Sequence, residues 1–221
     1  MTATIFQPTE YTAALMFQVR QHALRGRLDE VLEIGTGSGV VLAQMLALGA
    51  RRALGVDIEA EAVHSTRRLV DGLGAGARAE VVQGDMWAPC AGRRFDLIAT
   101  NLPQFPVQRP LDDGRLPSWS AGGPDGRALI DRFLADLPAH LNPGGRALMT
   151  HNEFADVALT GERLQALGLR ATVATTVCAP VPLHKWAGLT PQVVERFMGS
   201  GLLRLGEHAF AVFHVLEIAH A

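Results

Sequence analysis

The spacing of apolar positions alternates between two patterns along the chain, and the alternation predicts strands interleaved with helices. Short apolar runs bounded by turn residues, which are typical of buried strands, occupy residues 29–34, 52–57, 79–83, 95–100, 146–150, 169–178 and 209–218. Apolar residues at helical spacing occupy residues 10–24, 39–48, 59–70 and 126–137, and a segment before Gly168. Strands that alternate with helices of roughly ten to fifteen residues predict a parallel sheet covered on both faces.

Polar or glycine residues follow four of the predicted strands. Gly35, Asp57, Asp85 and Asn101 each come directly after, or close after, a different apolar run. In open parallel sheets, ligands bind at the carboxyl ends of the strands, near the switch in strand order. These four residues therefore predict one ligand site at a single edge of the sheet.

The turn after the first strand carries glycines at 35, 37 and 39. A dinucleotide fingerprint needs its third small residue one position later, where this chain has Val40, so the pyrophosphate pattern is incomplete and a nucleotide-dependent oxidoreductase is disfavoured. The bare turn lets a ligand approach the backbone closely, although it can also be a simple tight connection. Asp57 can accept the hydroxyls of a ribose or cap the next helix, and Asp85 can accept from an exocyclic amine or be an ordinary turn residue.

Composition narrows the class of protein. A chain of 221 residues with 48% apolar residues is long enough for one well-buried domain. Its formal charge of −2 gives no reason to expect a nucleic acid or a membrane as partner. Cys90 and Cys178 match no metal-ligand spacing, and no cluster of His, Cys and acidic residues predicts a metal. A reducing cytoplasm is the expected compartment.

Residues 33–39 (Glu-Ile-Gly-Thr-Gly-Ser-Gly), followed by Asp57 and by Gly84-Asp85-Met86, resemble the class I, or seven-stranded, S-adenosylmethionine-dependent methyltransferases. The resemblance implies an α/β fold with a Rossmann-like, doubly wound, mostly parallel seven-stranded sheet whose last strand is antiparallel. It places the methionine part of the cofactor on the glycine turn, the ribose on Asp57 and the adenine on Asp85 and Met86. The cofactor-binding residues it implies are Thr12, Glu33, Gly35, Thr36, Gly37, Gly39, Asp57, Ile58, Asp85, Met86 and Asn101.

Asn101-Leu102-Pro103-Gln104 resembles the Asn-Pro-Pro-Tyr loop of nitrogen-directed methyltransferases. Residues 5–12, 37–41 and 119–127 are similar to segments of the compact HemK-type glutamine methyltransferases that act on release factors. The resemblance implies that the Asn101 side-chain oxygen and the Leu102 carbonyl accept the N–H groups of the methyl acceptor, while Pro103 holds the loop rigid. The catalytic residues it implies are Asn101, Leu102, Pro103 and Gln104.

Two departures from that family concern the acceptor. Gln104 replaces an aromatic residue that packs against a flat acceptor group, so a stacking surface is lost and hydrogen-bonding groups are added. Residues 179–205 are an insertion between the last two strands, which either caps a small-molecule pocket with His184 and Trp186 or forms a dimer contact or a loop. His151 is either a base or hydrogen-bonding wall, or structural. The expected substrate-binding residues are Gln104, Trp119, His151 and Trp186.

The predicted organisation is an N-terminal helical lead-in, residues 1–28, and a methyltransferase domain, residues 29–221, that carries the insertion. The predicted function is methyl transfer from S-adenosylmethionine to a nitrogen of a small polar metabolite or of a protein glutamine, and the two departures favour the metabolite. Two alternatives stay open: methylation of oxygen or sulfur, and a non-catalytic, methyltransferase-like binding subunit. The protein is expected to be a monomer or a homodimer without a nucleic-acid or membrane partner.

Overall fold

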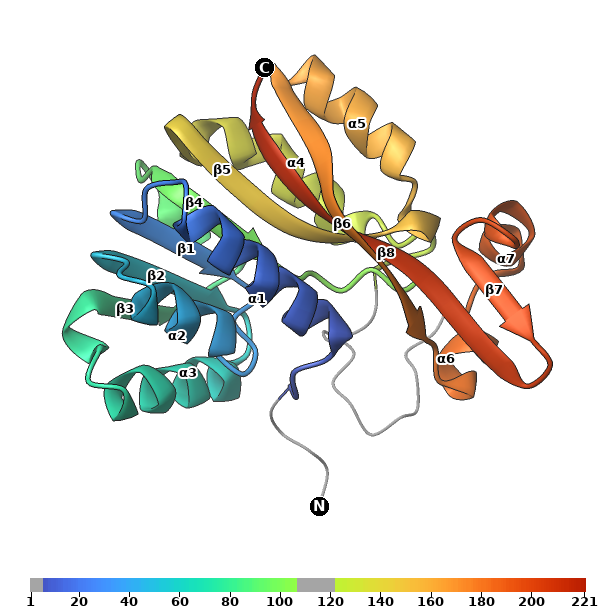
Figure 1. Ribbon diagram of the computed structural model, residues 1–221, viewed down its shortest axis with the longest axis horizontal. Helices are drawn as coiled ribbons and strands as arrows, with labels where there is room; N and C mark the ends of the chain where they lie inside the picture. The colour runs from blue at the N-terminus through green and yellow to red at the C-terminus, as the bar shows by residue number, and fades with distance from the viewer. Residues whose placement is uncertain (1–5, 107–121) are drawn as a thin grey trace.

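The computed structural model describes residues 6–106 and 122–221 and is built around one mixed sheet (Figure 1). In the described residues the sheet has eight strands, of which seven follow the order β3-β2-β1-β4-β5-β8-β6, while β7 lies off this path and pairs with β8. The strands are β1 Glu30–Ile34, β2 Arg52–Asp57, β3 Ala79–Gln83, β4 Phe95–Thr100, β5 Leu141–Asn152, β6 Leu169–Pro180, β7 Leu202–Leu205 and β8 His208–His220.

Strand directions confirm the predicted fold class. Strands β3, β2, β1, β4 and β5 run parallel, whereas β8 runs antiparallel to both β5 and β6. The chain moves outward from β1 to β2 and β3 and then returns to β4 on the other side of β1. This reversal of strand order lies between β1 and β4, so their carboxyl ends are where a ligand crevice is expected.

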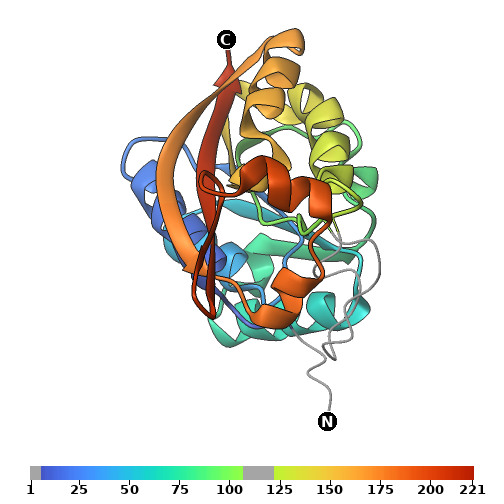
Figure 2. The same cartoon turned by 90° about the vertical axis from the view of Figure 1, so that its right-hand side faces the viewer.

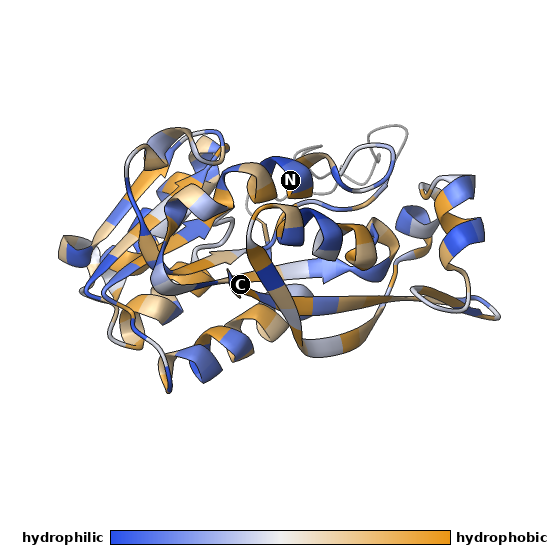
Figure 3. Ribbon diagram, turned by 90° about the horizontal axis from the view of Figure 1, so that it is seen from above, coloured by the Kyte–Doolittle hydropathy of each residue, from blue (hydrophilic) through white to orange (hydrophobic). Residues whose placement is uncertain are grey.

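Helices cover both faces of the sheet (Figure 1). The helices are α1 Glu10–Ala23, α2 Val40–Ala47, α3 Ala60–Gly72, α4 Ala128–His140, α5 Val157–Ala166, α6 Leu183–Ala187 and α7 Pro191–Phe197. One apolar core packs α1, α2 and α3 against the sheet, and a second packs α4 and α5 against the opposite face. In Figure 3 the central strands are largely apolar, while the helices combine apolar and polar segments. This pattern is the one expected when amphipathic helices cover a buried sheet.

The 179–205 segment lies at one end of the sheet, beside β8, and contains α6, α7 and β7 (Figure 1 and Figure 2). It has an apolar cluster of its own, formed by Phe105, Phe154, Val181, Trp186, Leu189, Val193, Phe197, Leu202, Ala209 and Ala211. Phe105 belongs to the chain just after the Asn-Leu-Pro-Gln loop. The segment is therefore anchored next to that loop by apolar packing.

Candidate active site

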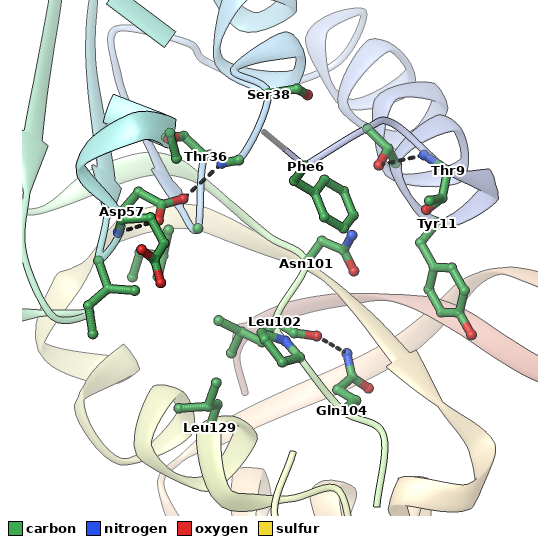
Figure 4. A pocket seen from close by; sticks show the side chains of 18 of the residues that line it. Phe6, Thr9, Tyr11, Thr36, Ser38, Asp57, Asn101, Leu102, Gln104 and Leu129 are labelled. Carbon is green, nitrogen blue, oxygen red and sulfur yellow. Dashed lines mark hydrogen bonds between the residues drawn. The ribbon is translucent and has the colours of Figure 1, made fainter. Parts of the chain in front are cut away.

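A cavity of about 930 Å³ lies at the carboxyl edge of the parallel strands. Its walls come from the chain before α1, the glycine turn, the ends of several strands and the start of α6 (Figure 4). All four residues predicted to converge, Gly35, Asp57, Asp85 and Asn101, line it. A cavity of this size lies at the upper end of the range for small-molecule sites, so it has room for more than one ligand group.

The glycine turn needs glycine for two separate reasons. Gly35 and Gly37 have φ of +76° and +51°, in the left-handed region that favours glycine, and both line the cavity. At Gly39, with φ of +81°, a Cβ would come within 2.8 Å of Thr66 in α3. Gly39 is not among the residues that line the cavity. Gly39 therefore needs glycine both for its left-handed backbone and for helix packing, whereas Gly35 and Gly37 face the space for a ligand.

Asp57 connects the end of β2 to the glycine turn. Its Oδ2 accepts a hydrogen bond from the Gly37 N–H at 2.8 Å, and its Oδ1 accepts one from the Glu59 N–H at 2.9 Å (Figure 4). Burial raises the pKa of this carboxyl, and the two backbone hydrogen bonds oppose that rise. Each carboxylate oxygen has a further lone pair, so Asp57 can still accept two hydroxyls from a ligand in the cavity.

Glu33 is a buried acid that lines the same cavity. Its Oε2 accepts a hydrogen bond from the Leu42 N–H at 2.8 Å. Burial raises the pKa of Glu33 well above its usual value, and the charge of Asp57 adds to the rise. A cationic ligand group next to Glu33 would favour the ionised carboxylate, because an opposite charge offsets the cost of desolvation. The site therefore fits a positively charged ligand such as an amino acid ammonium or a sulfonium.

Asp85, Met86 and Ile58 also line the cavity. Met86 has φ of +51°, a conformation that is uncommon for a residue with a side chain and that often occurs at ligand sites. Asp85 accepts a hydrogen bond from Arg132 of α4 at 2.8 Å, between two half-exposed side chains. Because such exposed pairs contribute little stability, Arg132 can release Asp85 to a ligand at small cost.

The Asn101-Leu102-Pro103-Gln104 segment, here called the acceptor loop, begins where β4 ends. The Thr150 hydroxyl donates a hydrogen bond to the Asn101 Oδ1 at 2.6 Å. Figure 4 shows Asn101 between Phe6, which lies toward the glycine turn, and Leu102 and Gln104. The Leu102 carbonyl accepts from the Gln104 Nε2 at 3.3 Å, which leaves its second lone pair unassigned. The loop thus presents two oxygen acceptors beside the cavity.

Gln104 is only 2% exposed, and its side-chain amide is bound to the backbone of β5. The Nε2 donates to the Thr150 carbonyl at 2.7 Å, and the Oε1 accepts from the Asn152 N–H at 2.8 Å. A neighbouring parallel strand would hydrogen-bond the same carbonyl and N–H groups of β5. The Gln104 amide therefore continues the hydrogen bonding between β4 and β5 beyond the end of β4. Gln104 lines the cavity, but its hydrogen-bonding groups serve the loop.

We expect Gln104→Ala to lower the free energy of unfolding by about 1–3 kcal/mol, because it leaves two buried backbone groups without a partner. Gln104→Glu should lower it further, because a carboxylate cannot donate to the Thr150 carbonyl and would be buried beside it. Urea denaturation measures both effects. The control Gln165→Glu changes an exposed glutamine on α5 and should stay within about 0.5 kcal/mol of the wild type. An unchanged midpoint for Gln104→Glu would contradict this role.

Two glycines of the segment before α4 pack directly on Gln104. A Cβ on Gly122 would lie 2.7 Å from the Gln104 Cα, and one on Gly126 would lie 2.3 Å from the Gln104 carbonyl oxygen. The Gly122 N–H also donates to the Phe105 carbonyl at 2.9 Å. The part of this glycine-rich segment that the structure describes therefore packs directly against the acceptor loop.

Some predicted site residues lie elsewhere. His151 is fully buried, and its ring nitrogens contact the Asn152 carbonyl and the Thr160 hydroxyl, both at 2.8 Å. Burial lowers the pKa of His151 to about 4, so the ring is neutral. Neither His151 nor Trp186 lines the cavity. Successive side chains of a strand point to opposite faces, so the neighbours of His151, and not His151 itself, face the Asn101 side.

Trp186 instead packs inside the apolar cluster of the 179–205 segment, while His184 and Lys185 on the same helix line the cavity. Trp119 lies outside the described residues. Thr12 lines the cavity, but its Oγ1 accepts from the Thr9 N–H at 3.2 Å at the start of α1. Its hydroxyl thus already fixes the end of a helix.

The cavity also contains side chains that the sequence did not single out as site residues. Phe6, Tyr11 and Phe105 bring three aromatic rings to it. Tyr11 stacks on Phe213 with ring centroids 3.9 Å apart, and its hydroxyl donates to the Asn152 Oδ1 at 2.7 Å. Burial raises the pKa of Tyr11, which keeps this donor protonated. These three rings add aromatic surface to the cavity.

Among the described residues, no group of three or more histidine, cysteine or acidic side chains is arranged to hold a metal ion. Within residues 6–106 and 122–221, no helix is both long and apolar enough to cross a membrane.

A family model described as a methyltransferase domain matches residues 31–111. That stretch holds the glycine turn, Asp57, Asp85 and the acceptor loop. The matched domain and the fold agree with the class I methyltransferase fold predicted from the sequence.

Two relatives are named as glutamine methyltransferases. A Methanocaldococcus jannaschii relative, named as a protein N5-glutamine methyltransferase, is 26% identical over 180 residues, which are 80% of this chain and 86% of the relative. The release factor glutamine methyltransferase of Xylella fastidiosa is 33% identical over 155 residues, 65% of this chain and 54% of that protein. The chain thus spans most of the archaeal relative and about half the length of the bacterial one.

Solved structures agree on the fold. One match is a chain from an E. cuniculi complex responsible for methylation of a translation termination factor. Its TM-score is 0.62 at 16% identity, and the match covers 99% of this chain and 99% of that chain. Another match is a ribosomal protein L11 methylase from Lactobacillus delbrueckii, with a TM-score of 0.60 at 16% identity. This match covers 98% of this chain and 81% of the methylase chain. At these identities the likeness concerns the fold alone.

Proposed function

We propose that the protein transfers a methyl group from S-adenosylmethionine to the side-chain nitrogen of a glutamine in a protein substrate. The observation that carries the proposal is that the glycine turn and the Asn101–Leu102 acceptors line one cavity. The names of the relatives support a protein glutamine over the small metabolite that the substitution at Gln104 favoured. The rings of Phe6, Tyr11 and Phe105, which line the cavity, supply other aromatic surface for a planar amide.

S-adenosylmethionine supplies an electrophilic methyl when bound. In our proposal Gly35 and Gly37 lie against its methionine part, Glu33 pairs with its positive charge, and Asp57 accepts its ribose hydroxyls. Asp85, Met86 and Ile58 hold the adenine. Each assignment agrees with the burial and the remaining hydrogen-bonding capacity described above.

The acceptor amide presents two N–H groups. The Asn101 Oδ1 and the Leu102 carbonyl would accept these hydrogens and direct the nitrogen lone pair toward the methyl group. As the nitrogen–methyl bond forms, the sulfur–methyl bond would break, S-adenosylhomocysteine would leave, and one N–H proton would pass to solvent. Positioning of this kind lowers the barrier by several kcal/mol at about 3–3.5 Å between the reacting atoms. A hydroxyl or thiol acceptor presents a single hydrogen and would not use both acceptor oxygens. His151, which the sequence offered as a base or as a structural residue, lies outside the cavity.

Transfer of labelled methyl tests the proposal. Purified release factor is incubated with the enzyme and labelled cofactor, and a fractionated metabolite extract is tested in parallel. We expect label on a glutamine of a protein. Label only on a small molecule would overturn the assigned substrate class, and absence of cofactor binding in calorimetry would support the binding-subunit alternative.

Cofactor affinity should depend on pH through Glu33. Its pKa in the free protein is raised, so below that pKa a cation must displace a proton to pair with the carboxylate. Affinity for S-adenosylmethionine should therefore rise with pH and level off above the pKa of Glu33. Calorimetry in buffers of different ionisation enthalpy measures the released proton.

Glu33→Gln is the matched variant for this measurement, because its amide oxygen can still accept from the Leu42 N–H. We expect it to remove most of the pH dependence, leaving the smaller part due to Asp57, whose pKa is also raised. An unchanged pH dependence in Glu33→Gln would refute the assignment of the cation to Glu33.

Both cysteines are free thiols, with Cys90 buried and Cys178 exposed, which supports the reducing cytoplasm expected from the sequence.

A further inference from the structure

Thr150 of β5 holds both ends of the acceptor loop, although it does not itself line the cavity. Its hydroxyl donates to the Asn101 Oδ1 at 2.6 Å, and its backbone carbonyl accepts from the Gln104 Nε2 at 2.7 Å. Asn101 and Gln104 are the first and last residues of the loop. One residue behind the cavity wall thus anchors the whole four-residue turn.

Strand register explains how Thr150 reaches Asn101. The last ladder pair of β4 and β5 is Thr100 with Met149, so the next pair in register is Asn101 with Thr150. Side chains directly opposite one another on neighbouring strands point to the same face. On its other side, Thr150 pairs with Val215 of β8. The position of its side chain is therefore set by strands on both sides.

A hydroxyl at this position needs a reason, because Thr150 is 0% exposed. A valine would fill the same space without a polar atom, and burying a hydroxyl is unfavourable unless it is hydrogen-bonded. The β-branched side chain also has few rotamers, so the hydroxyl is held in one place. Among the described residues, its donor bond goes to Asn101.

The Asn101 amide depends on this bond for its orientation. The terminal torsion of an asparagine is broad, so the side chain alone does not decide whether oxygen or nitrogen faces a given direction. Within the described part of the chain, the Asn101 side chain makes one hydrogen bond, which it accepts from the Thr150 hydroxyl. It fixes the oxygen end and leaves that oxygen one lone pair for an N–H group in the cavity.

We infer that Thr150 is a positioning residue, which orients the Asn101 amide through its hydroxyl so that the oxygen meets the acceptor N–H. The inference rests on the proposed function only for its effect on the rate of methylation; the orientation of Asn101 is a property of the protein alone.

The test compares Thr150→Val with Thr150→Ser. Thr150→Val removes only the hydroxyl and keeps the carbonyl that binds Gln104, while Thr150→Ser retains a donor. Thr160→Val is the matched control, because Thr160 is also fully buried and its hydroxyl bonds His151 and Arg127, away from the cavity. The control should lower the melting temperature and leave both readouts below unchanged.

The first readout is the pair of side-chain amide signals of Asn101 in nitrogen-15 NMR, identified by their loss in Asn101→Ala. We expect them to shift in Thr150→Val, and to stay near their wild-type positions in Thr150→Ser and Thr160→Val. Unshifted signals in Thr150→Val would overturn the inference, whatever happens to activity.

The second readout is kinetic. Thr150→Val should lower kcat by about 10- to 100-fold, as expected for a slightly misplaced reactive group. KM and the affinity for S-adenosylmethionine should change by less than about twofold, because the residue does not touch either ligand. Thr150→Ser should restore most of the rate. In an Asn101→Ala background, Thr150→Val should cost almost nothing more, since both changes remove the same contact.

The outcomes separate the two proposals. Shifted Asn101 signals with an unchanged kcat, or a full additional loss in the Asn101→Ala background, would overturn the positioning role. If the signals shift in Thr150→Val but the wild-type protein methylates no glutamine, the orientation of Asn101 is supported and the proposed function is wrong.

Discussion

Asn101→Ala is expected to lower kcat for methyl transfer by about 100- to 1,000-fold, the loss typical of removing one preorganised hydrogen-bonding group from an active site. The change removes the side-chain oxygen that we assign to the acceptor N–H and leaves only the Leu102 carbonyl. Steady-state kinetics with labelled cofactor measure the effect. Affinity for S-adenosylhomocysteine, measured by calorimetry, should change far less than kcat, because Asn101 is the one altered residue among those implied to bind the cofactor.

Asn142→Ala is the control for this change. Asn142 donates to the Asp96 Oδ1 at 2.9 Å, at the opposite edge of the same sheet, so its loss should leave kcat unaltered. A turnover near the wild-type value in Asn101→Ala would refute nitrogen methylation through this loop. It would favour the alternative of an oxygen or sulfur acceptor.

Asp57→Ala is expected to weaken binding of S-adenosylmethionine by at least about 100-fold. The carboxylate is assigned two ribose hydroxyls, and hydrogen bonds to a charged group contribute about 1.5–3 kcal/mol each. The same change removes the acceptor for the Gly37 N–H, which should loosen the glycine turn. Isothermal titration calorimetry gives the affinity, and circular dichroism at the same temperature verifies that the variant is folded.

The exposed Asp136 on α4 offers the matched control, since Asp136→Ala removes an equal charge far from any described contact with the cavity. It should bind the cofactor as the wild type does. If folded Asp57→Ala binds the cofactor normally, the assignment of the ribose to the end of β2 is wrong.

Elements with strong local signals were predicted closely from the sequence. The bounds of β2, β3 and β4 coincide with the predicted runs, because each run is apolar and flanked by turn residues. The short β7 was not predicted, since its pairing depends on β8 and leaves little local pattern. β5 begins earlier than predicted, at Leu141, because the Asn-Pro-Gly-Gly sequence read as a turn is accommodated as an irregularity in its pairing with β4.

Convergence of the site on one sheet edge was also predictable, because it follows from strand direction. The partners of each residue were not. His151 was chosen as a strand-end residue, but the alternation of side chains places it on the face away from Asn101. The bond from Thr150 to Asn101 depends on the register of two strands separated by about fifty residues of chain, as does the burial of Gln104. No local pattern encodes that register.

The atom that receives the methyl group decides the central claim. A protein substrate methylated with labelled cofactor is hydrolysed in strong acid, and the volatile products are identified. Methyl on a glutamine nitrogen leaves as labelled methylamine, which is the predicted result for the wild type, with almost none from Asn101→Ala. Label released as methanol by mild base, or retained on a sulfur-containing residue, would contradict the account.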